Sequence, residues 1–283
     1  MLMLIALNGT LPEMARAAGV THASVPPGWA PDVKAASAYA RGRAGTVSFA
    51  VRTKGRFWGR DARRSANSAS VIKAMLMVTY LNHPSVRDRE LTAQDQALLS
   101  PMIRWSSNDA ATAVHNYVGD ALVMALAKRA RMSDFKVAPA WGLSQINARD
   151  QSRFFLRLPE LTPQRHRRYA LRLLGNIVPE QRWGVGQFAP RGWKLHFKGG
   201  WSSGTGAVSH QVALLRRGKQ RVSIAILTND SPTHAYSEQT LRGVAKRLML
   251  GLRKAPRSVA LFPTPTCIGR TRLRRPAHRH ADA

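Results

Sequence analysis

The spacing of hydrophobic positions predicts strands at both ends of the chain. Residues 46–52 alternate and are rich in β-forming residues, and four further segments have the character of strands. The segments are 46–52, 56–60, 193–197, 207–215 and 222–228. Lys54–Gly55 predicts a turn between the first two, and 216–219 a hairpin between the last two.

Between these strands the spacing becomes helical. Residues 70–81 are apolar almost all round, which indicates a buried helix. The segment 92–104 opens with Thr92-Ala-Gln-Asp95, close to a capping box. Further predicted helices cover 32–41, 108–118, 120–131, 148–158, 163–174 and 236–252.

This order of elements predicts the fold class. Strands on both sides of a helical insertion must share one sheet if either half is to bury its apolar face. We therefore expect an α+β fold, with an antiparallel five-stranded sheet flanked by terminal helices and a separate all-helical lobe. The expected domain spans 26–255, with its α/β lobe at 32–67 and 190–252 and its helical lobe at 68–189.

The two ends of the chain differ in composition from this domain. The apolar start, Met1 to Leu7, indicates a truncated secretory signal and linker within 1–25, or alternatively a buried N-terminal helix. Residues 256–283 are rich in Pro and Arg and predict a disordered basic tail. The single cysteine, Cys267, lies in that tail, so an intrachain disulfide is excluded. No segment is long and apolar enough to predict a transmembrane helix.

The charge of the chain is strongly positive. Lys and Arg total 44 against 15 Asp and Glu, for a formal net charge of +29. This excess is compatible with an anionic partner such as a cell-wall polymer, although a general arginine bias on solvated faces is the favoured explanation. We do not expect nucleic acid as the partner, because zinc-finger spacing, RNP-type aromatic motifs and a helix-turn-helix are all missing.

Ser70-Val-Ile-Lys73 is the first motif that could carry chemistry. Ser70 would begin the buried helix, which places Lys73 one turn later on the same face. A serine hydroxyl becomes a nucleophile when a nearby base takes its proton, and burial lowers a lysine pKa enough for this task. A second Ser-x-x-Lys, at Ser133 to Lys136, lacks an apolar helix behind it and is interpreted as chance.

Two further motifs follow, Ser106-Ser-Asn108 and Lys198-Gly199-Gly200. Each has a plain structural explanation when taken alone. Ser and Asn are good helix N-caps, and Lys-Gly-Gly suits a strand that runs into a tight turn.

Taken together, in this order and on these elements, the motifs resemble the serine β-lactamase and D-Ala-D-Ala peptidase superfamily. Its signature is Ser-x-x-Lys, Ser-Asp-Asn and Lys-Thr-Gly. The resemblance covers about residues 32–252, and the sequences around Met102–Ala111 and His196–Gly200 are similar to those of the class A branch.

The resemblance implies roles for individual residues. Ser70 would be the acylated nucleophile, Lys73 its proton acceptor and Ser106 the proton relay to the leaving nitrogen. Asn108 would hold the substrate amide, and Lys198 would supply positive charge. The Gly199–Gly200 backbone would line the substrate, and the N–H groups of Ser70 and Trp201 would form the oxyanion hole. It also implies a β-lactam or peptidoglycan-type peptide as substrate, a monomer, no cofactor or metal, and a secreted or extracytoplasmic location.

The chain departs from the family pattern at several positions. Ser107 stands where class A enzymes carry Asp, and Gly199 replaces a hydroxyl residue that would bind a substrate carboxylate, a loss for which Ser202 or Ser203 could compensate. The stretch 133–146 contains no Glu, and Asp134 is its only acid. Since an acyl-enzyme needs a base to activate water, we expect poor deacylation.

Three alternatives remain open from the sequence. One is a catalytically weak pseudoenzyme on the same scaffold, and another is a basic binding protein for an anionic polymer. The third is an α/β-hydrolase elbow at Gly200-Trp-Ser-Ser-Gly204, for which His210 is poorly placed as a partner because it lies on the strand predicted to follow. That elbow requires a helix directly after it, whereas a strand is predicted there.

Overall fold

The computed structural model describes residues 29–202 and 207–252. The predicted signal segment, the basic tail with Cys267, and Ser203 lie outside the described residues.

Within the described residues, the strands form a five-stranded antiparallel sheet in the order β2-β1-β7-β6-β5. The pairing of β1 with β7 joins the two ends of the chain, with Phe49 opposite Ile226. The strands are β1 (Thr46–Arg52), β2 (Phe57–Arg60), β5 (Lys194–Ser202), β6 (Ala207–Arg217) and β7 (Gln220–Ser231). The fold class expected from the order of elements is therefore confirmed.

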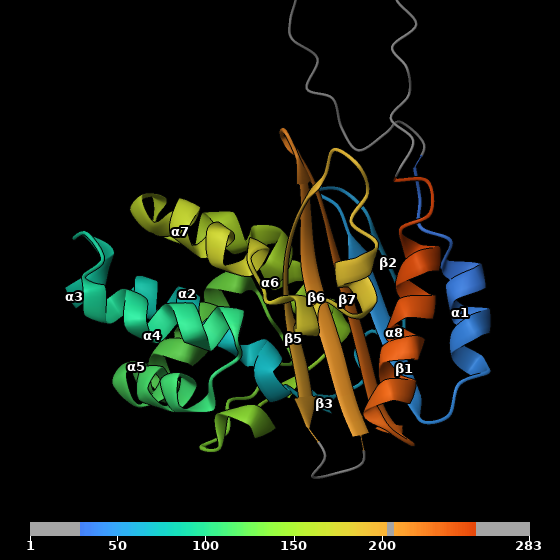
Figure 1. The fold of residues 1–283 in the computed structure, drawn as a ribbon, viewed down its shortest axis with the longest axis horizontal. Helices are drawn as coiled ribbons and strands as arrows, with labels where there is room; N and C mark the ends of the chain where they lie inside the picture. Colours follow the sequence, from blue (N-terminus) through green and yellow to red (C-terminus); the bar gives the residue numbers. More distant parts are fainter. Residues whose placement is uncertain (1–28, 203–206, 253–283) are drawn as a thin grey trace, which may run out of the picture.

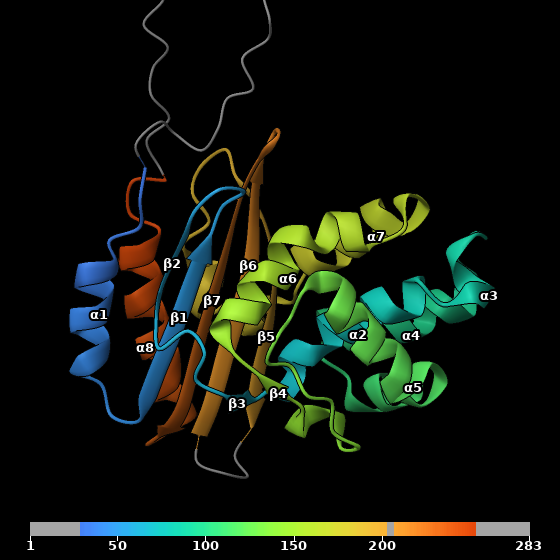
Figure 2. The same cartoon turned by 180° about the vertical axis from the view of Figure 1, so that it is seen from behind.

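The sheet separates two layers of helices (Figures 1 and 2). Helices α1 (Val33–Arg41) and α8 (His234–Leu248) cover one face. The remaining helices lie on the other side of the sheet, where α6 (Ala148–Leu161) packs on β1 and β7. Because each face of the sheet is covered, alternating strand residues from both faces enter the core.

The helical side is built around a buried helix, α2 (Lys73–Leu81), in which every residue is buried. A helix with no exposed face needs neighbours all round, and α4, α5, α7 and the preceding 3-10 turn provide them. The other helical elements are α3 (Pro84–Arg87), α4 (Ala93–Arg104), α5 (Asn108–Ala130), α7 (Gln164–Gly175), and the 3-10 turns η1 (Ala69–Ile72), η2 (Trp141–Leu143), η3 (Pro179–Gln181) and η4 (Gly184–Gln187).

Local structure differs from the sequence predictions in several places. The predicted helix 70–81 begins as the 3-10 turn η1 before it becomes α2. The predicted helices 108–118 and 120–131 form the single element α5, kinked at Gly119, whose φ is 68°. Strand β5 is longer than predicted, so Lys198-Gly-Gly lies inside a strand rather than before a turn.

A small two-stranded sheet, β3 (Ala66–Asn67) with β4 (Gln145–Ile146), was not predicted from the sequence. It ties the segment before Ser70 to the loop after α5. Ser68 reinforces this link, because its backbone N–H donates to the Ser144 carbonyl at 2.8 Å and its hydroxyl donates to the Trp141 carbonyl at 3.2 Å.

Candidate active site

Ser70 lies in the turn η1, directly before helix α2. A 3-10 turn has three residues per turn, so side chains three positions apart lie in line, here Ser70 and Lys73. Ala69, immediately before Ser70, has a φ of 43°, in the left-handed region that non-glycine residues rarely adopt. Such backbone conformations persist only where the surrounding structure enforces them, and they cluster at functional sites. Ser70 itself is 8% exposed.

Lys73 is completely buried at the start of α2. Its Nζ donates to the Ser106 carbonyl at 2.6 Å, to Asn108 Oδ1 at 2.7 Å and to Ser106 Oγ at 3.3 Å. All of these acceptors are neutral. Burial without a compensating anion disfavours the ammonium form and lowers the pKa of Lys73 to about 7.

The segment Ser106–Asn108 forms the junction between α4 and α5. Ser106 has a φ of 64°, a left-handed conformation that turns the chain between the two helices. Ser107 is the N-cap of α5, where its Oγ accepts from the Ala110 N–H at 3.2 Å. The N-cap is therefore Ser107 rather than Ser106 or Asn108, and Asp would cap the helix equally well at that position. Ser106 and Asn108 contact Lys73 instead.

Lys198, on β5, reaches the same junction from the sheet. Its Nζ donates to Ser106 Oγ at 3.1 Å and to the Gly199 carbonyl at 2.9 Å. Lys198 is completely buried, and its pKa is lowered well below the usual range by burial and by the charge of Lys73. Ser106 Oγ thus lies between two buried lysines that come from different lobes.

Within the described residues, neither lysine has a carboxylate within 4.0 Å. Asp134, the only acid of the stretch 133–146, instead pairs with Arg63 at 2.7 Å and accepts from Asn147 Nδ2 at 2.8 Å. Lys73 instead has a cation–π contact with the ring of Trp141, whose centroid lies 4.8 Å from Lys73 Nζ.

Gly200 allows β5 to approach η1 closely. A Cβ at Gly200 would lie 2.7 Å from the Val71 nitrogen and 2.8 Å from the Ser70 nitrogen, inside the contact limit. Only glycine therefore permits this packing. The backbone of β5 at Gly200 and Trp201 consequently lies against the turn that carries Ser70.

Gly199 faces the other side of β5. A Cβ at this position would lie 3.2 Å from the ring of Trp183, which in turn packs edge-on against Trp201 at 6.1 Å. Trp183 thus leaves little room for the side chain that the family pattern has at this position.

Two aromatic residues of this region were missed by sequence reasoning, Trp141 and Trp183. Both lie in irregular segments that combine short 3-10 turns with coil, so no periodicity places them. Their contacts with Lys73 and Gly199 depend on the fold alone.

The structure brings Ser106, Asn108, Lys73 and Lys198 into direct contact and places Ser70 one 3-10 turn before Lys73. In the described part of the chain, the Ser70 hydroxyl forms no hydrogen bond with Lys73. The alternative elbow at Gly200 is wrong, because strand β6 follows it where a helix is required. His210 is buried between Asn67 and Thr228, and burial lowers its pKa to about 4.

Comparison with known proteins identifies the relatives of this fold. The sequence model described as the beta-lactamase enzyme family matches residues 87–250. A search of curated protein sequences finds no match. Three solved structures illustrate the structural likeness. A β-lactamase from Sphaerobacter thermophilus DSM 20745 is 18% identical at a TM-score of 0.67, covering 77% of this chain and 97% of that one.

The two other structures are equally similar. A β-lactamase from Xanthomonas campestris pv. campestris str. ATCC 33913 is 15% identical at a TM-score of 0.66, with 76% and 95% coverage. One from Burkholderia vietnamiensis is 16% identical at 0.66, with 77% and 95% coverage. At these identities the structures show the shared fold, while the sequence match extends over more than half of the chain. The chain therefore belongs to the beta-lactamase enzyme family and has the fold of its serine hydrolases.

Proposed function

We propose that this protein is a serine hydrolase that forms an acyl-enzyme at Ser70 on an amide or ester, either a β-lactam or a peptidoglycan-type peptide. One observation carries the proposal. The Ser106 hydroxyl accepts hydrogen bonds from Lys73 at 3.3 Å and from Lys198 at 3.1 Å, in a setting buried between two lobes. Because both lone pairs of Ser106 are engaged, its own proton is free to be donated toward a leaving nitrogen.

Acylation can be derived from these positions. Ser70 Oγ bonds to the substrate carbonyl carbon as its proton moves to neutral Lys73. The carbon–nitrogen bond then breaks, and the proton passes from Lys73 through Ser106 to the leaving nitrogen. A lysine with a pKa of about 7 suits this task, because near neutral pH it is present both as base and as acid.

Lys198, Asn108 and the β5 backbone complete the proposed site. Lys198 holds Ser106 by a hydrogen bond and becomes a cation when an anionic substrate group raises its lowered pKa. Asn108, already bound to Lys73 at 2.7 Å, holds the substrate amide. The N–H groups of Ser70 and Trp201 form the oxyanion hole, since Gly200 allows the two backbone segments to meet.

Deacylation is proposed to be slow. Hydrolysis of an acyl-enzyme requires a base that activates water, and in the described residues no carboxylate contacts Lys73 or Lys198. The ring of Trp141 occupies the space over Lys73 instead. We also propose an extracytoplasmic location, where a substrate of this class would be met.

The test is intact mass after incubation with a penicillin and, separately, with a fluorophosphonate. Wild type is expected to gain one adduct, and Ser70→Ala none. Ser133→Ala is the matched control, because Ser133 begins the second Ser-x-x-Lys of the chain, and it is expected to label fully. The penicillin adduct should persist, and turnover of nitrocefin should be slow.

Other outcomes distinguish the alternatives. Fluorophosphonate labelling without a penicillin adduct would retain Ser70 as nucleophile and remove β-lactams from the substrate class. Absence of labelling by both reagents in folded wild type would favour the pseudoenzyme. Rapid nitrocefin turnover would overturn slow deacylation while leaving the nucleophile in place.

A further inference from the structure

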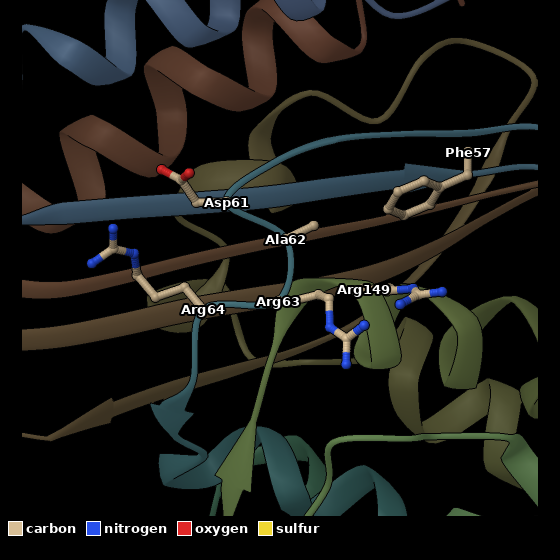
Figure 3. A pocket seen from close by; sticks show the side chains of 6 residues that line it. All are labelled: Phe57, Asp61, Ala62, Arg63, Arg64 and Arg149. Atoms are coloured by element: carbon tan, nitrogen blue, oxygen red, sulfur yellow. The ribbon is translucent and has the colours of Figure 1, made fainter.

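A pocket at the edge of the sheet opposite Lys198 gathers arginines around a small apolar surface (Figure 3). Its volume is about 560 Å³. It lies beside β2, at one edge of the sheet, whereas Lys198 is on β5, at the other edge. The lining residues are Phe57, Asp61, Ala62, Arg63, Arg64 and Arg149. None of these contacts Lys73, Ser106 or Lys198, so the pocket is separate from the proposed acylation site.

The walls of the pocket are set by backbone contacts. The loop after β2 packs against the first turn of α6, where the Arg149 N–H donates to the Ala62 carbonyl at 2.8 Å. In the view of Figure 3, the Arg149 guanidinium lies between the ring of Phe57 and the Arg63 guanidinium. Phe57 is 42% exposed, and its ring extends toward Ala62.

Positive charge around the pocket exceeds the negative charge that could balance it. Asp61 is paired with Arg60 at 3.7 Å, and Asp134 with Arg63 at 2.7 Å. In the part of the chain that the structure describes, Arg149 and Arg64 have no carboxylate within 4.0 Å.

A further arginine contacts the lining of the pocket. The Arg52 guanidinium stacks on the Phe57 ring at 4.5 Å. Burial and the charges of Arg153 and Arg149 lower the pKa of Arg52 to about 10, while buried Asp150 opposes that shift. The charges of these arginines repel one another, and a bound anion would relieve the repulsion.

The chemistry of the lining selects the kind of anion. Guanidinium groups bind phosphate and carboxylate through paired N–H donors, and two arginines that line one pocket favour a group with more than one negative charge. A phosphomonoester carries about −1.5 to −2 charges near neutral pH, whereas a carboxylate carries one. The exposed ring of Phe57 offers a surface for a planar or apolar part of the same ligand.

We propose that this pocket is a binding site for a small organic phosphate. Arg149 and the Arg63 donors that Asp134 does not occupy would hold the phosphate, and Phe57 would contact the organic part. The site does not depend on the proposed function of Ser70. It is a place where a phosphorylated small molecule can bind while Ser70 remains free.

The test is calorimetric titration of the full chain with phenyl phosphate, benzoate and inorganic phosphate, at fixed ionic strength. Phenyl phosphate is expected to bind about tenfold more tightly than benzoate, because of its second charge. Inorganic phosphate should bind more weakly than phenyl phosphate, and Phe57→Leu should reduce that difference. Equal, weak binding of all three would overturn the site.

Charge-matched variants separate a site from a general cationic field. Arg149→Gln and Arg63→Gln should each weaken phenyl phosphate binding about tenfold or more. Arg168→Gln removes the same charge from an exposed position on α7 and should leave binding unchanged. If Arg168→Gln weakened binding as much as Arg63→Gln, the affinity would belong to the net charge and the proposal would fail. Arg63 is exposed, so its variant remains informative even if Arg149→Gln does not fold. Thermal unfolding of each variant checks that the fold is kept.

Discussion

At the scale of single residues, the lysine pair around Ser106 is the unusual feature of this molecule. Buried cations are normally paired with anions, because desolvation penalises an isolated charge. Lys73 and Lys198 have only hydroxyl, amide and carbonyl partners in the described structure. Their lowered pKa values reduce this penalty, because the neutral amine is more populated than in an exposed lysine. The neutral form of Lys73 is the base that the proposed acylation of Ser70 requires.

The first prediction concerns pH. If neutral Lys73 is the base, acylation of Ser70 should be slow when Lys73 is protonated and should rise as pH increases through about 7, then level off. The measurement is the rate of adduct formation with a fluorophosphonate, read by intact mass over about pH 5.5 to 9. At each pH, the rate is corrected for the loss of fluorophosphonate by hydrolysis in the buffer. A flat profile across this window would remove Lys73 as the base.

The second prediction concerns Gly200. In Gly200→Ala the new Cβ would meet the Ser70 and Val71 nitrogens, so β5 and η1 must separate. We expect a loss of about 1–3 kcal/mol in stability and a fall in Ser70 labelling of about tenfold or more. Gly55→Ala is the matched control, because a Cβ there meets nothing within 4 Å. Thermal unfolding and labelling are measured on both, and equal behaviour of the two variants would contradict the close approach.

At the scale of elements, sequence reasoning succeeded where a local rule decides the structure. Thr92 and Asp95 form the expected capping box of α4, and the alternation over 46–52 forms β1. The motif residues Ser106, Asn108 and Lys198 were candidates because their motifs resemble the superfamily signature, and the structure brings them together. The 3-10 turn at Ser70 was not predicted, because the spacing of apolar residues does not distinguish a helix that begins with a 3-10 turn from one that begins as an α-helix.

The rest of the candidate site could not be predicted from the sequence, because it depends on long-range packing. The ring of Trp141 reaches Lys73 from an irregular loop, and Trp183 restricts Gly199 from another. Neither contact leaves a pattern in the sequence, because residues in irregular segments lack the periodicity that indicates which residues pack together. The sequence showed that the stretch 133–146 contains no glutamate, but it could not predict that the ring of Trp141 lies over Lys73.

The third prediction concerns the network that joins α2 to α4. The buried Asp95 carboxylate accepts from Tyr80 at 2.6 Å and from Arg89 at 2.6 Å, and it caps α4 with Thr92. The Arg89 guanidinium and the other donors hold the pKa of Asp95 well below its usual range. We expect Asp95→Asn to cost about 1–3 kcal/mol, and Thr92→Ala about 1 kcal/mol.

The pH dependence is set by the direction of this shift. Because the folded pKa of Asp95 is depressed, its contribution is complete above the unfolded value, near 4, and is lost as pH falls through the folded value. The difference in unfolding free energy between wild type and Asp95→Asn should thus be constant from about pH 7 to pH 5 and shrink in stronger acid. Urea unfolding at each pH measures it. A difference that grew toward acid would have the wrong sign for this network.

At the scale of the whole molecule, the residues that give the net positive charge differ from those that surround Ser106. The net charge of +29 belongs to the complete chain and is spread over many arginines, several of them exposed. The cations nearest Ser106, by contrast, are two buried lysines that come from different lobes. In the described residues no helix has the length and apolar character of a membrane span. Attraction to an anionic polymer and acylation of Ser70 are therefore expected to depend on different sets of residues.

Salt separates these two properties, which gives the fourth prediction. At about 0.1 M salt the screening length is about 10 Å, and at about 1 M it is about 3 Å, so interactions between exposed charges weaken while buried groups are screened much less. Retention on a sulfated polysaccharide should fall steeply with salt, because it depends on exposed arginines. The rate of Ser70 acylation by an uncharged fluorophosphonate should change less than about twofold, because Lys73, Lys198 and Ser106 are held by short buried hydrogen bonds. A parallel fall of both would mean that the exposed charges tune the reactive serine.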